Sequence, residues 1–276
     1  MAKKNAQKEM SFLNHLEELR WMLVRSTIAI LVMAVVSFFF SDFIFNKILF
    51  GPKDPNFITY RFFCNLTQYV GLEETDICNT ELSFIIQNTD MSGQFSFLIW
   101  TCITVGFILA FPVVLWEIWK FIRPALYDNE RKYAKAFISV SSLLFFAGVV
   151  FGYLVVAPLS IYFFGNFSVS NEILNEINLT SYTGMIKTSV IACGFMFELP
   201  ILIFFLSKLG LVTPAFLRKY RRHAIVIILF IAAIITPPDV ISQIIVSIPI
   251  LILYEISILI SAVIEKKENN KLTEEA

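Results

Sequence analysis

The chain has 276 residues, of which 57% are apolar and 29 are Phe, and its formal net charge is zero. Only 16% of the residues are charged, whereas about a quarter are charged in an average soluble domain. Together with a mean hydropathy of +0.72, this excludes an ordinary soluble globular domain. The charges gather between long apolar runs, so we predict an integral membrane protein that crosses the bilayer several times.

Six apolar runs are long enough, or nearly so, to cross a bilayer as helices, which takes roughly 20 residues. Pro158 is expected to end the membrane-spanning part of the third run. Residues 1–264 form one predicted all-α transmembrane domain with a long outer loop at 46–90, and the polar tail at 265–276 is expected to be disordered. In chain order, the predicted spans cover residues 22–45, 91–118, 136–157, 188–207, 223–237 and 240–262.

The Lys and Arg residues are distributed unequally between the two sides of the membrane. Of the 22, 18 fall in the amino-terminal segment, in the tail and in the loops after the second and fourth spans. Cytoplasmic loops carry an excess of these residues, so both ends of the chain are predicted to be cytoplasmic. The first apolar run is too long for a cleavable signal peptide, and no small-residue cleavage site follows it. A bacterial plasma (inner) membrane is the simplest location.

The fifth and sixth predicted spans are short. The fifth has about 12 to 15 residues before Asp239, which is about 20 Å of helix, against a hydrocarbon core of about 30 Å. By the same measure, the sixth reaches the cytoplasmic surface near Tyr254 and leaves Glu255 at the interface. Two interpretations stay open: tilted or shielded helices in a compact bundle, or local thinning of the bilayer that eases the passage of polar chain.

Glu198 lies near the middle of the fourth apolar run, between Lys187 and Lys208. A carboxylate at the bilayer centre costs about 3 kcal/mol on insertion scales, so we expect it to face the bundle interior or a wet cavity. We favour a functional polar site, with Gln243 of the sixth span as a hydrogen-bonding partner. The alternative is a single interhelical hydrogen bond that holds the bundle together.

The predicted cytoplasmic face carries two carboxylates close to the membrane. Residues 11–23 have apolar side chains at helical spacing and are predicted to form an amphipathic helix at the inner membrane surface, with Glu18 on its polar face. The next inner loop places Glu130 among aromatic residues and cations. Each carboxylate could accept a bidentate guanidinium. Ordinary solvated salt bridges to neighbouring arginines are the alternative.

Five short segments, in order along nearly the whole chain, carry a family likeness. His15–Arg20 and Phe121–Arg131 lie on the predicted cytoplasmic side, Phe197–Pro200 in the fourth span, and Thr236–Gln243 and Tyr254–Ile256 at the last two spans. They resemble the amino-terminal motif, first cytoplasmic loop, fourth helix, last turn and last helix of the TatC family, at similar spacing. Any one match is weak, but together they are specific.

The resemblance implies a concave, glove-shaped bundle of six helices that serves as the signal-peptide receptor subunit of the twin-arginine protein translocase. Glu18 and Glu130 match family positions that contact the consecutive arginines of the signal peptide, with Phe121 and Arg20 nearby. A planar guanidinium matches a carboxylate bidentately whereas an ammonium does not, which gives a physical reason for a preference for arginine over lysine.

The resemblance also implies roles for residues away from this face. Glu198 matches an intramembrane acid of the family, and Gln243 matches a position that contacts partner subunits. Pro52, Pro238 and Asp239 match periplasmic-side positions that are important for transport. The implied partners are TatA- and TatB-type single-span subunits, further copies of the chain, the lipid bilayer and the twin-arginine signal peptides of folded cargo proteins, but no nucleic acid.

The implied activity is transport of folded proteins driven by the proton-motive force, without enzymatic activity or a cofactor. In agreement, the sequence contains no Walker-type nucleotide-binding loop. A proton-coupled small-solute transporter built on Glu198 is the alternative. Such transporters usually show inverted repeats or helices broken at mid-membrane, and the sequence indicates neither.

The first outer loop, 46–90, is longer than the usual loop of the family and contains Cys64 and Cys78. Because this loop faces the oxidising side of the membrane, we predict a disulfide between them. Two unpaired thiols are the alternative. Cys102 and Cys193 fall within predicted spans, and we expect both to be packed core residues.

Overall fold

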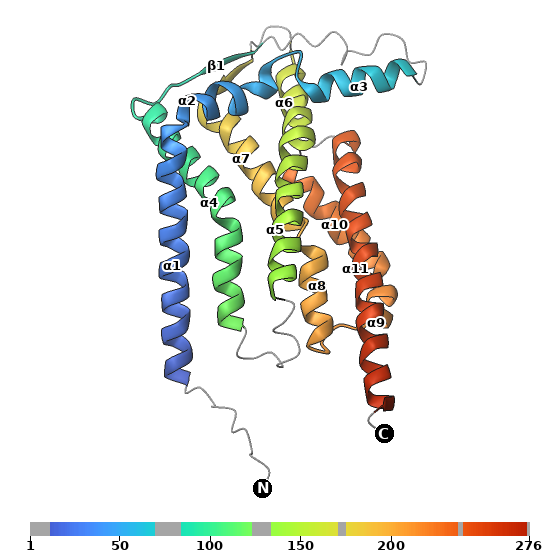
Figure 1. Cartoon of the computed structure of the whole chain (residues 1–276). Helices are drawn as coiled ribbons and strands as arrows, with labels where there is room; N and C mark the ends of the chain where they lie inside the picture. Colours follow the sequence, from blue (N-terminus) through green and yellow to red (C-terminus); the bar gives the residue numbers. More distant parts are fainter. Residues whose placement is uncertain (1–11, 70–83, 123–133, 171–174, 237–239, 275–276) are drawn as a thin grey trace. The chain divides into compact units, whose positions relative to one another are not determined.

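The structure is a computed structural model, and it is helical over most of its length (Figure 1). The chain forms two compact units, one of residues 1–40 and 99–142 and the other of residues 41–98 and 143–276. Each unit is described by itself below. The structure describes residues 12–69, 84–122, 134–170, 175–236 and 240–274.

The first unit is built on helix α1 (Phe12–Phe39), most of helix α4 (Gly93–Ile122) and the beginning of helix α5 (Ala134–Phe151). We predicted an amphipathic helix at residues 11–23, and the segment is helical from Phe12, but it is not an element of its own. The segment is the first part of α1 and continues into the apolar span without a break. The reason is that α1 contains no Gly or Pro, the residues that most often end a helix.

Helices α1 and α4 lie side by side in the first unit (Figure 1). A Cβ atom on Gly106 of α4 would lie 2.6 Å from the backbone nitrogen of Ala34 in α1. Small residues allow such close approach of helices in membranes, where packing replaces the hydrophobic effect as the driving force. The contact between Gly106 and Ala34 therefore brings the charged ends of both helices together.

The second unit starts with short elements, most of them in the predicted first outer loop. Helix α2 (Ser41–Phe43) is followed by a π-helical segment (Ile44–Leu49), a 3-10 turn (Gly51–Lys53) and helix α3 (Ile58–Tyr69). Strand β1 (Ile85–Gln87) then pairs in parallel with strand β2 (Glu176–Asn178), with Ile86 opposite Ile177. Neither strand was predicted, because three-residue strands leave too little alternation to detect.

The third apolar helix does not end at Pro158 as predicted. Helix α5 passes through a π-helical turn (Gly152–Val156) into helix α6 (Ala157–Asn166). Proline lacks the N–H that would bond to the carbonyl four residues earlier, which here belongs to Leu154. The Thr59 hydroxyl of α3 donates to that carbonyl instead. A contact from a distant segment therefore allows the helix to continue.

The fourth apolar stretch consists of helix α7 (Leu179–Met196) and helix α8 (Leu199–Lys208), separated by a turn at Phe197 and Glu198. The sequence indicated no broken helix, and this interpretation was wrong. Pro200 lies in the first turn of α8, where it has no N–H with which to continue the α7 ladder. Helix α7 also begins before the predicted residue 188, because the Asn178 side chain caps it by accepting from the Thr180 N–H.

The carboxy-terminal part holds helix α9 (Pro214–Lys219), helix α10 (Arg221–Ile235) and helix α11 (Val240–Glu274). The short fifth span is confirmed, since α10 has only 15 residues. Helix α11 has 35 residues and runs past 262, through most of the segment that we expected to be a disordered tail. That segment is rich in Glu and Lys, which are good helix formers.

The core of the second unit lies among its last helices. Side chains from α8, α10 and α11 form a buried cluster that includes Ile203, Ile228, Ala232, Val246 and Ile250. Among the described residues, five helical stretches are long and apolar enough to cross a membrane, namely α1, α4, α5 with α6, α7 with α8, and α11, and the shorter α10 is the sixth apolar helix. The predicted fold class, a helical membrane protein of six apolar helices, is therefore confirmed.

Candidate functional site

The first unit contains a pocket of about 560 Å³ between the amino-terminal end of α1 and the carboxy-terminal end of α4. Its lining combines five charged side chains with apolar ones, so it suits a ligand that is both charged and partly apolar. The lining residues are Glu17, Glu18, Trp21, Met22, Arg25, Glu117, Lys120 and Phe121.

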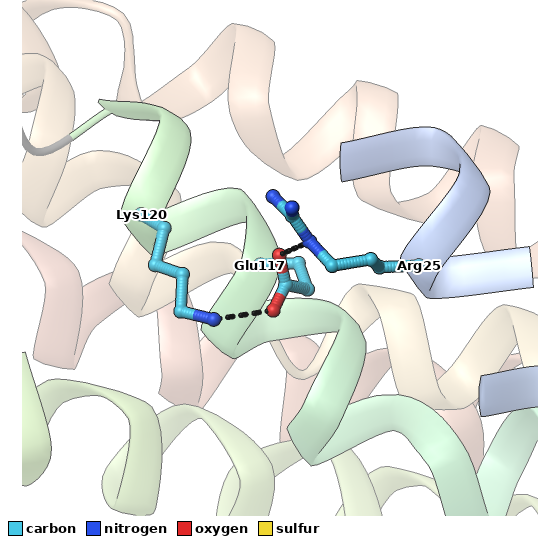
Figure 2. A network of polar contacts seen from close by, with 3 residues as sticks. All are labelled: Arg25, Glu117 and Lys120. Atoms are coloured by element: carbon cyan, nitrogen blue, oxygen red, sulfur yellow. Dashed lines mark hydrogen bonds and ion pairs between the residues drawn. The ribbon is translucent and has the colours of Figure 1, made fainter. Parts of the chain in front are cut away.

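Glu117 forms the centre of an ion-pair network in this pocket (Figure 2). The Arg25 Nε–H donates to its Oε2 at 2.7 Å, and the Lys120 Nζ donates to its Oε1 at 2.6 Å. The Glu117 side chain is 6% exposed, whereas those of Arg25 and Lys120 are 50% and 48% exposed. A buried carboxylate is tolerated because both of its oxygens receive charge-assisted hydrogen bonds.

The helical sequence places these charges. Glu117 and Lys120 are three residues apart on α4, a spacing that puts side chains on one face. Lys120 is in the last turn of α4, where the helix dipole favours a cation. Its Nζ also lies 5.8 Å from the ring centroid of Trp116. Arg25 approaches from α1, so the network joins the two helices.

Two aromatic residues of the pocket lining, Trp21 and Phe121, contact side chains outside the lining. The rings of His15 in α1 and Phe121 in α4 are stacked with their centroids 4.3 Å apart. The Arg20 guanidinium lies 5.9 Å from the ring centroid of Trp21. Phe121 is therefore held in place by α1 and presents part of its ring to the pocket.

The structure brings together only part of the predicted cytoplasmic site. Glu18 and Phe121 both line the pocket, and both were predicted. Arg20 is exposed and is not among the lining residues. Glu130 lies outside the described residues. The contact between Glu18 and a peptide arginine stays a prediction.

Sequence reasoning missed Glu117, Arg25 and Lys120. A signal was present, because Glu117 is the first charge after an apolar run that is uncharged from Met91 to Trp116. A carboxylate at the end of a span, followed three residues later by a lysine, indicates a network at the membrane surface. Its partner Arg25 could not be identified, since it lies 92 positions away.

Two further predicted positions lie among the last helices of the second unit. Glu198 directly precedes α8, and its backbone carbonyl accepts from the N–H groups of Ile201 and Leu202. The Gln243 side chain of α11 donates from Nε2 to the Leu229 carbonyl of α10 at 3.0 Å. Gln243 thus contributes to the packing of α10 against α11. The functional role predicted for both residues stays a prediction.

The predicted outer positions are partly described. Pro52 is buried, and its carbonyl accepts from the Tyr60 hydroxyl at 2.9 Å. Burial raises the pKa of the Tyr60 phenol. Pro238 and Asp239 lie outside the described residues. All three transport roles stay predictions.

The described cysteines agree with the prediction of one disulfide-bonded thiol in the long loop and two packed thiols in the spans. Cys64 is disulfide-bonded. Cys78 lies outside the described residues, so the pairing of these two stays a prediction. Cys102 and Cys193 are free and buried, as expected of packed core residues.

Comparison with known proteins identifies the family. A family model described as Sec-independent protein translocase protein (TatC) matches residues 14–249. The chain belongs to the TatC family. A TatC-family protein of Blattabacterium sp. subsp. Periplaneta americana is 42% identical over 96% of this chain and 100% of its own length. A TatC-family protein of Aquifex aeolicus is 34% identical over 94% of this chain and 98% of its own.

Solved structures agree with this TatC-family assignment. A crystal structure titled twin arginine translocase receptor TatC has a TM-score of 0.67 and 32% sequence identity, and covers 91% of this chain and 99% of its own. A second, of the same receptor in DDM, has a TM-score of 0.69 and 33% identity. This TatC-family chain is thus a multi-pass inner-membrane component of a Sec-independent protein translocase, which has a transport role and not an enzymatic one.

Proposed function

We propose that this chain is the receptor subunit of a twin-arginine translocase and binds the paired arginines of signal peptides at its cytoplasmic face. The observation that carries the proposal is the pocket of the first unit, where the Glu18 carboxylate and the Phe121 ring line one cavity. Glu130, the second acid of the proposed site, belongs to the loop that follows Phe121 in the sequence.

The charges of the pocket favour a guanidinium ligand. Glu17 and Glu18 are exposed and have no ion-pair partner among the described residues. A planar guanidinium can donate two parallel hydrogen bonds to one carboxylate, whereas an ammonium binds as a point charge. The Phe121 and Trp21 rings add surfaces on which guanidinium groups and apolar side chains pack. The arrangement therefore favours arginine over lysine.

The orientation and partners complete the proposal. Both ends of the chain lie in the cytoplasm, and the excess of Lys and Arg in the segments assigned to that side supports this orientation.

Single-span subunits of the TatA and TatB type bind around Glu198 and Gln243, and further copies of this chain join the receptor complex. Folded cargo then crosses the membrane at the expense of the proton-motive force. The break between α7 and α8 at Glu198 supports a functional intramembrane acid.

The test is binding of the purified full chain, in nanodiscs, to a twin-arginine signal peptide and to its twin-lysine control. We expect tighter binding of the twin-arginine peptide. A Glu18→Gln variant should weaken it by about tenfold or more, since a hydrogen bond to a charged group contributes about 1.5–3 kcal/mol. Glu265→Gln, which removes an exposed carboxylate of α11, is the matched control and should leave binding unchanged.

Equal affinity for the two peptides, unaffected by Glu18→Gln, would contradict the receptor proposal. A loss of binding in Glu265→Gln as large as that in Glu18→Gln would show that total charge, and not this pocket, governs the interaction. Glu130→Gln should behave as Glu18→Gln does, because both acids belong to the proposed site.

A further inference from the structure

Glu117 differs from the other two carboxylates of the pocket in its environment. It is nearly buried and accepts a hydrogen bond at each oxygen, from Arg25 at 2.7 Å and from Lys120 at 2.6 Å (Figure 2). Glu17 and Glu18 line the same pocket, but they are exposed and form no ion pair with any other residue that the structure describes. The two cations of the pocket are therefore both bound by Glu117 and not by Glu17 or Glu18.

The position of Arg25 along α1 shows why its pairing with Glu117 matters for the pocket. Helices α1 and α4 run antiparallel, because His15 stacks on Phe121 while Arg25 pairs with Glu117. His15 and Arg25 are about 15 Å apart along α1, whereas Glu117 and Phe121 are only about 6 Å apart along α4. The Arg25 side chain spans much of the difference by reaching toward the amino-terminal end of α1, as helical side chains tend to do.

Both cations thus line the same pocket as Glu17 and Glu18. Lys120 lies beside Phe121, and its side chain is half exposed. Arg25 uses only its Nε–H for Glu117, and its two Nη groups have no hydrogen-bond partner among the described residues. If Glu117 did not hold these long side chains, the remaining carboxylates of the pocket would attract them.

We infer that Glu117 is a positioning residue for the peptide site: it holds Arg25 and Lys120, and so keeps the Glu18 carboxylate available for a guanidinium of the peptide. Glu117 itself does not contact the peptide. Its removal releases two internal cations that compete with the peptide arginines for Glu18. The consequence for peptide binding rests on the proposed function above, whereas the exchange of ion pairs can be measured without a peptide.

The first experiment detects that exchange by zero-length cross-linking of the full chain in nanodiscs. A water-soluble carbodiimide joins a carboxylate and an amine in contact as an amide, with loss of water. In the unmodified chain we expect an amide between Lys120 and Glu117. In Glu117→Gln we expect it between Lys120 and Glu17 or Glu18, identified by mass spectrometry. The Glu117→Gln/Lys120→Gln variant is the control, and it should lose the new product.

The second experiment measures affinity for the twin-arginine peptide. Glu117→Gln should weaken binding by about tenfold or more, because a charge-assisted hydrogen bond to the peptide is replaced by an internal one. The triple variant Arg25→Gln/Glu117→Gln/Lys120→Gln removes the competing cations together with Glu117. We expect it to bind the peptide nearly as tightly as the unmodified chain, which a merely structural role for Glu117 would not allow.

Two results would overturn the inference. One is the absence of any cross-link from Lys120 to Glu17 or Glu18 in Glu117→Gln. The other is a triple variant that binds as weakly as Glu117→Gln, which would mean that the network acts only by holding α1 against α4. If the unmodified chain does not distinguish the two peptides, the receptor proposal fails, while the cross-linking result still decides whether Glu117 holds the cations away from Glu18.

Discussion

The Ser207 hydroxyl of α8 donates to the Ser261 hydroxyl of α11 at 2.8 Å, and both side chains are buried. In an apolar surrounding, a hydroxyl without a partner is costly, so the two serines satisfy each other. Ile203, Tyr254 and Ile258 of the second unit's core come from the same two helices. The pair is therefore a specific polar link within an otherwise apolar contact.

We expect Ser207→Ala and Ser261→Ala each to lower the free energy of unfolding, with a coupling between the two of about 0.6 kcal/mol. The double variant should then be little less stable than either single one, because the shared hydrogen bond is lost only once. Unfolding in detergent, followed by Trp fluorescence, measures all four proteins. Ser139→Ala, at an exposed position of α5, is the control. Fully additive losses would show that the hydroxyls do not interact.

Tyr60 of α3 provides a second test. Its hydroxyl lies 2.9 Å from the Pro52 carbonyl and 3.1 Å from the Pro158 carbonyl. Tyr60→Phe removes the single O–H that these two carbonyls share as a donor, so we expect a loss of about 1–3 kcal/mol of stability. Tyr69→Phe is the control, because that side chain is 94% exposed. Thermal unfolding compares the two variants, and equal effects would contradict the structural role of Tyr60.

Tyr60 also predicts a pH dependence. Burial raises the pKa of its phenol in the folded chain above the ordinary value, so the folded state keeps the proton that the unfolded state releases above about pH 10. The stability contributed by Tyr60 is thus complete below pH 10 and is lost as the pH rises further. Unfolding measured between about pH 8 and 11 should show this decline in the unmodified chain and a smaller one in Tyr60→Phe. Parallel declines would contradict the prediction.

Gly106 tests the contact that brings the two halves of the pocket together. A Cβ atom there would lie 2.6 Å from the Ala34 backbone, so Gly106→Ala should push α1 away from α4 and cost about 1–3 kcal/mol. It should also weaken peptide binding, since Glu18 and Phe121 lie on the two separated helices. Gly184→Ala in α7 is the matched control, because nothing lies within 4 Å of the added methyl group.

Thermal unfolding and peptide binding are measured on both glycine variants. The expected result for Gly184→Ala is no loss, or a small gain from higher helix propensity. If Gly106→Ala is as stable as Gly184→Ala and binds the peptide normally, the close packing of α1 and α4 does not shape the pocket.

The sequence predicted those features that depend on a residue's own chemistry and its near neighbours. The apolar runs identified the six helices, since no other local structure satisfies the backbone in lipid. The short span before Asp239 was confirmed as the 15-residue helix α10. The family likeness at His15–Arg20 and around Phe121 was confirmed by the TatC-family match over residues 14–249. It pointed to the helix ends that line the pocket, where Glu18 and Phe121 were named in advance.

Where the predictions failed, a partner far away in the sequence decided the outcome. Pro158 does not end its helix, because the Thr59 hydroxyl, 95 residues distant, satisfies the carbonyl that proline leaves without a donor. Strands β1 and β2 are likewise short and pair across a long stretch of chain. Local sequence rules predict that a proline interrupts a helix, but they cannot predict a hydrogen-bond donor from a distant segment that compensates for it.

The charged pocket likewise combines a feature that the sequence predicted with pairings that only the tertiary structure decided. By itself, the sequence predicted that Glu18 lies at the membrane surface beside an apolar run, because charges are excluded from the membrane interior. Only the tertiary structure decided which carboxylate pairs with which cation, since Arg25 and Glu117 are 92 residues apart. The close packing of α1 against α4 buries Glu117 and leaves Glu18 exposed. A buried carboxylate must bind the available cations, whereas an exposed one is stabilised by water and stays accessible to a ligand.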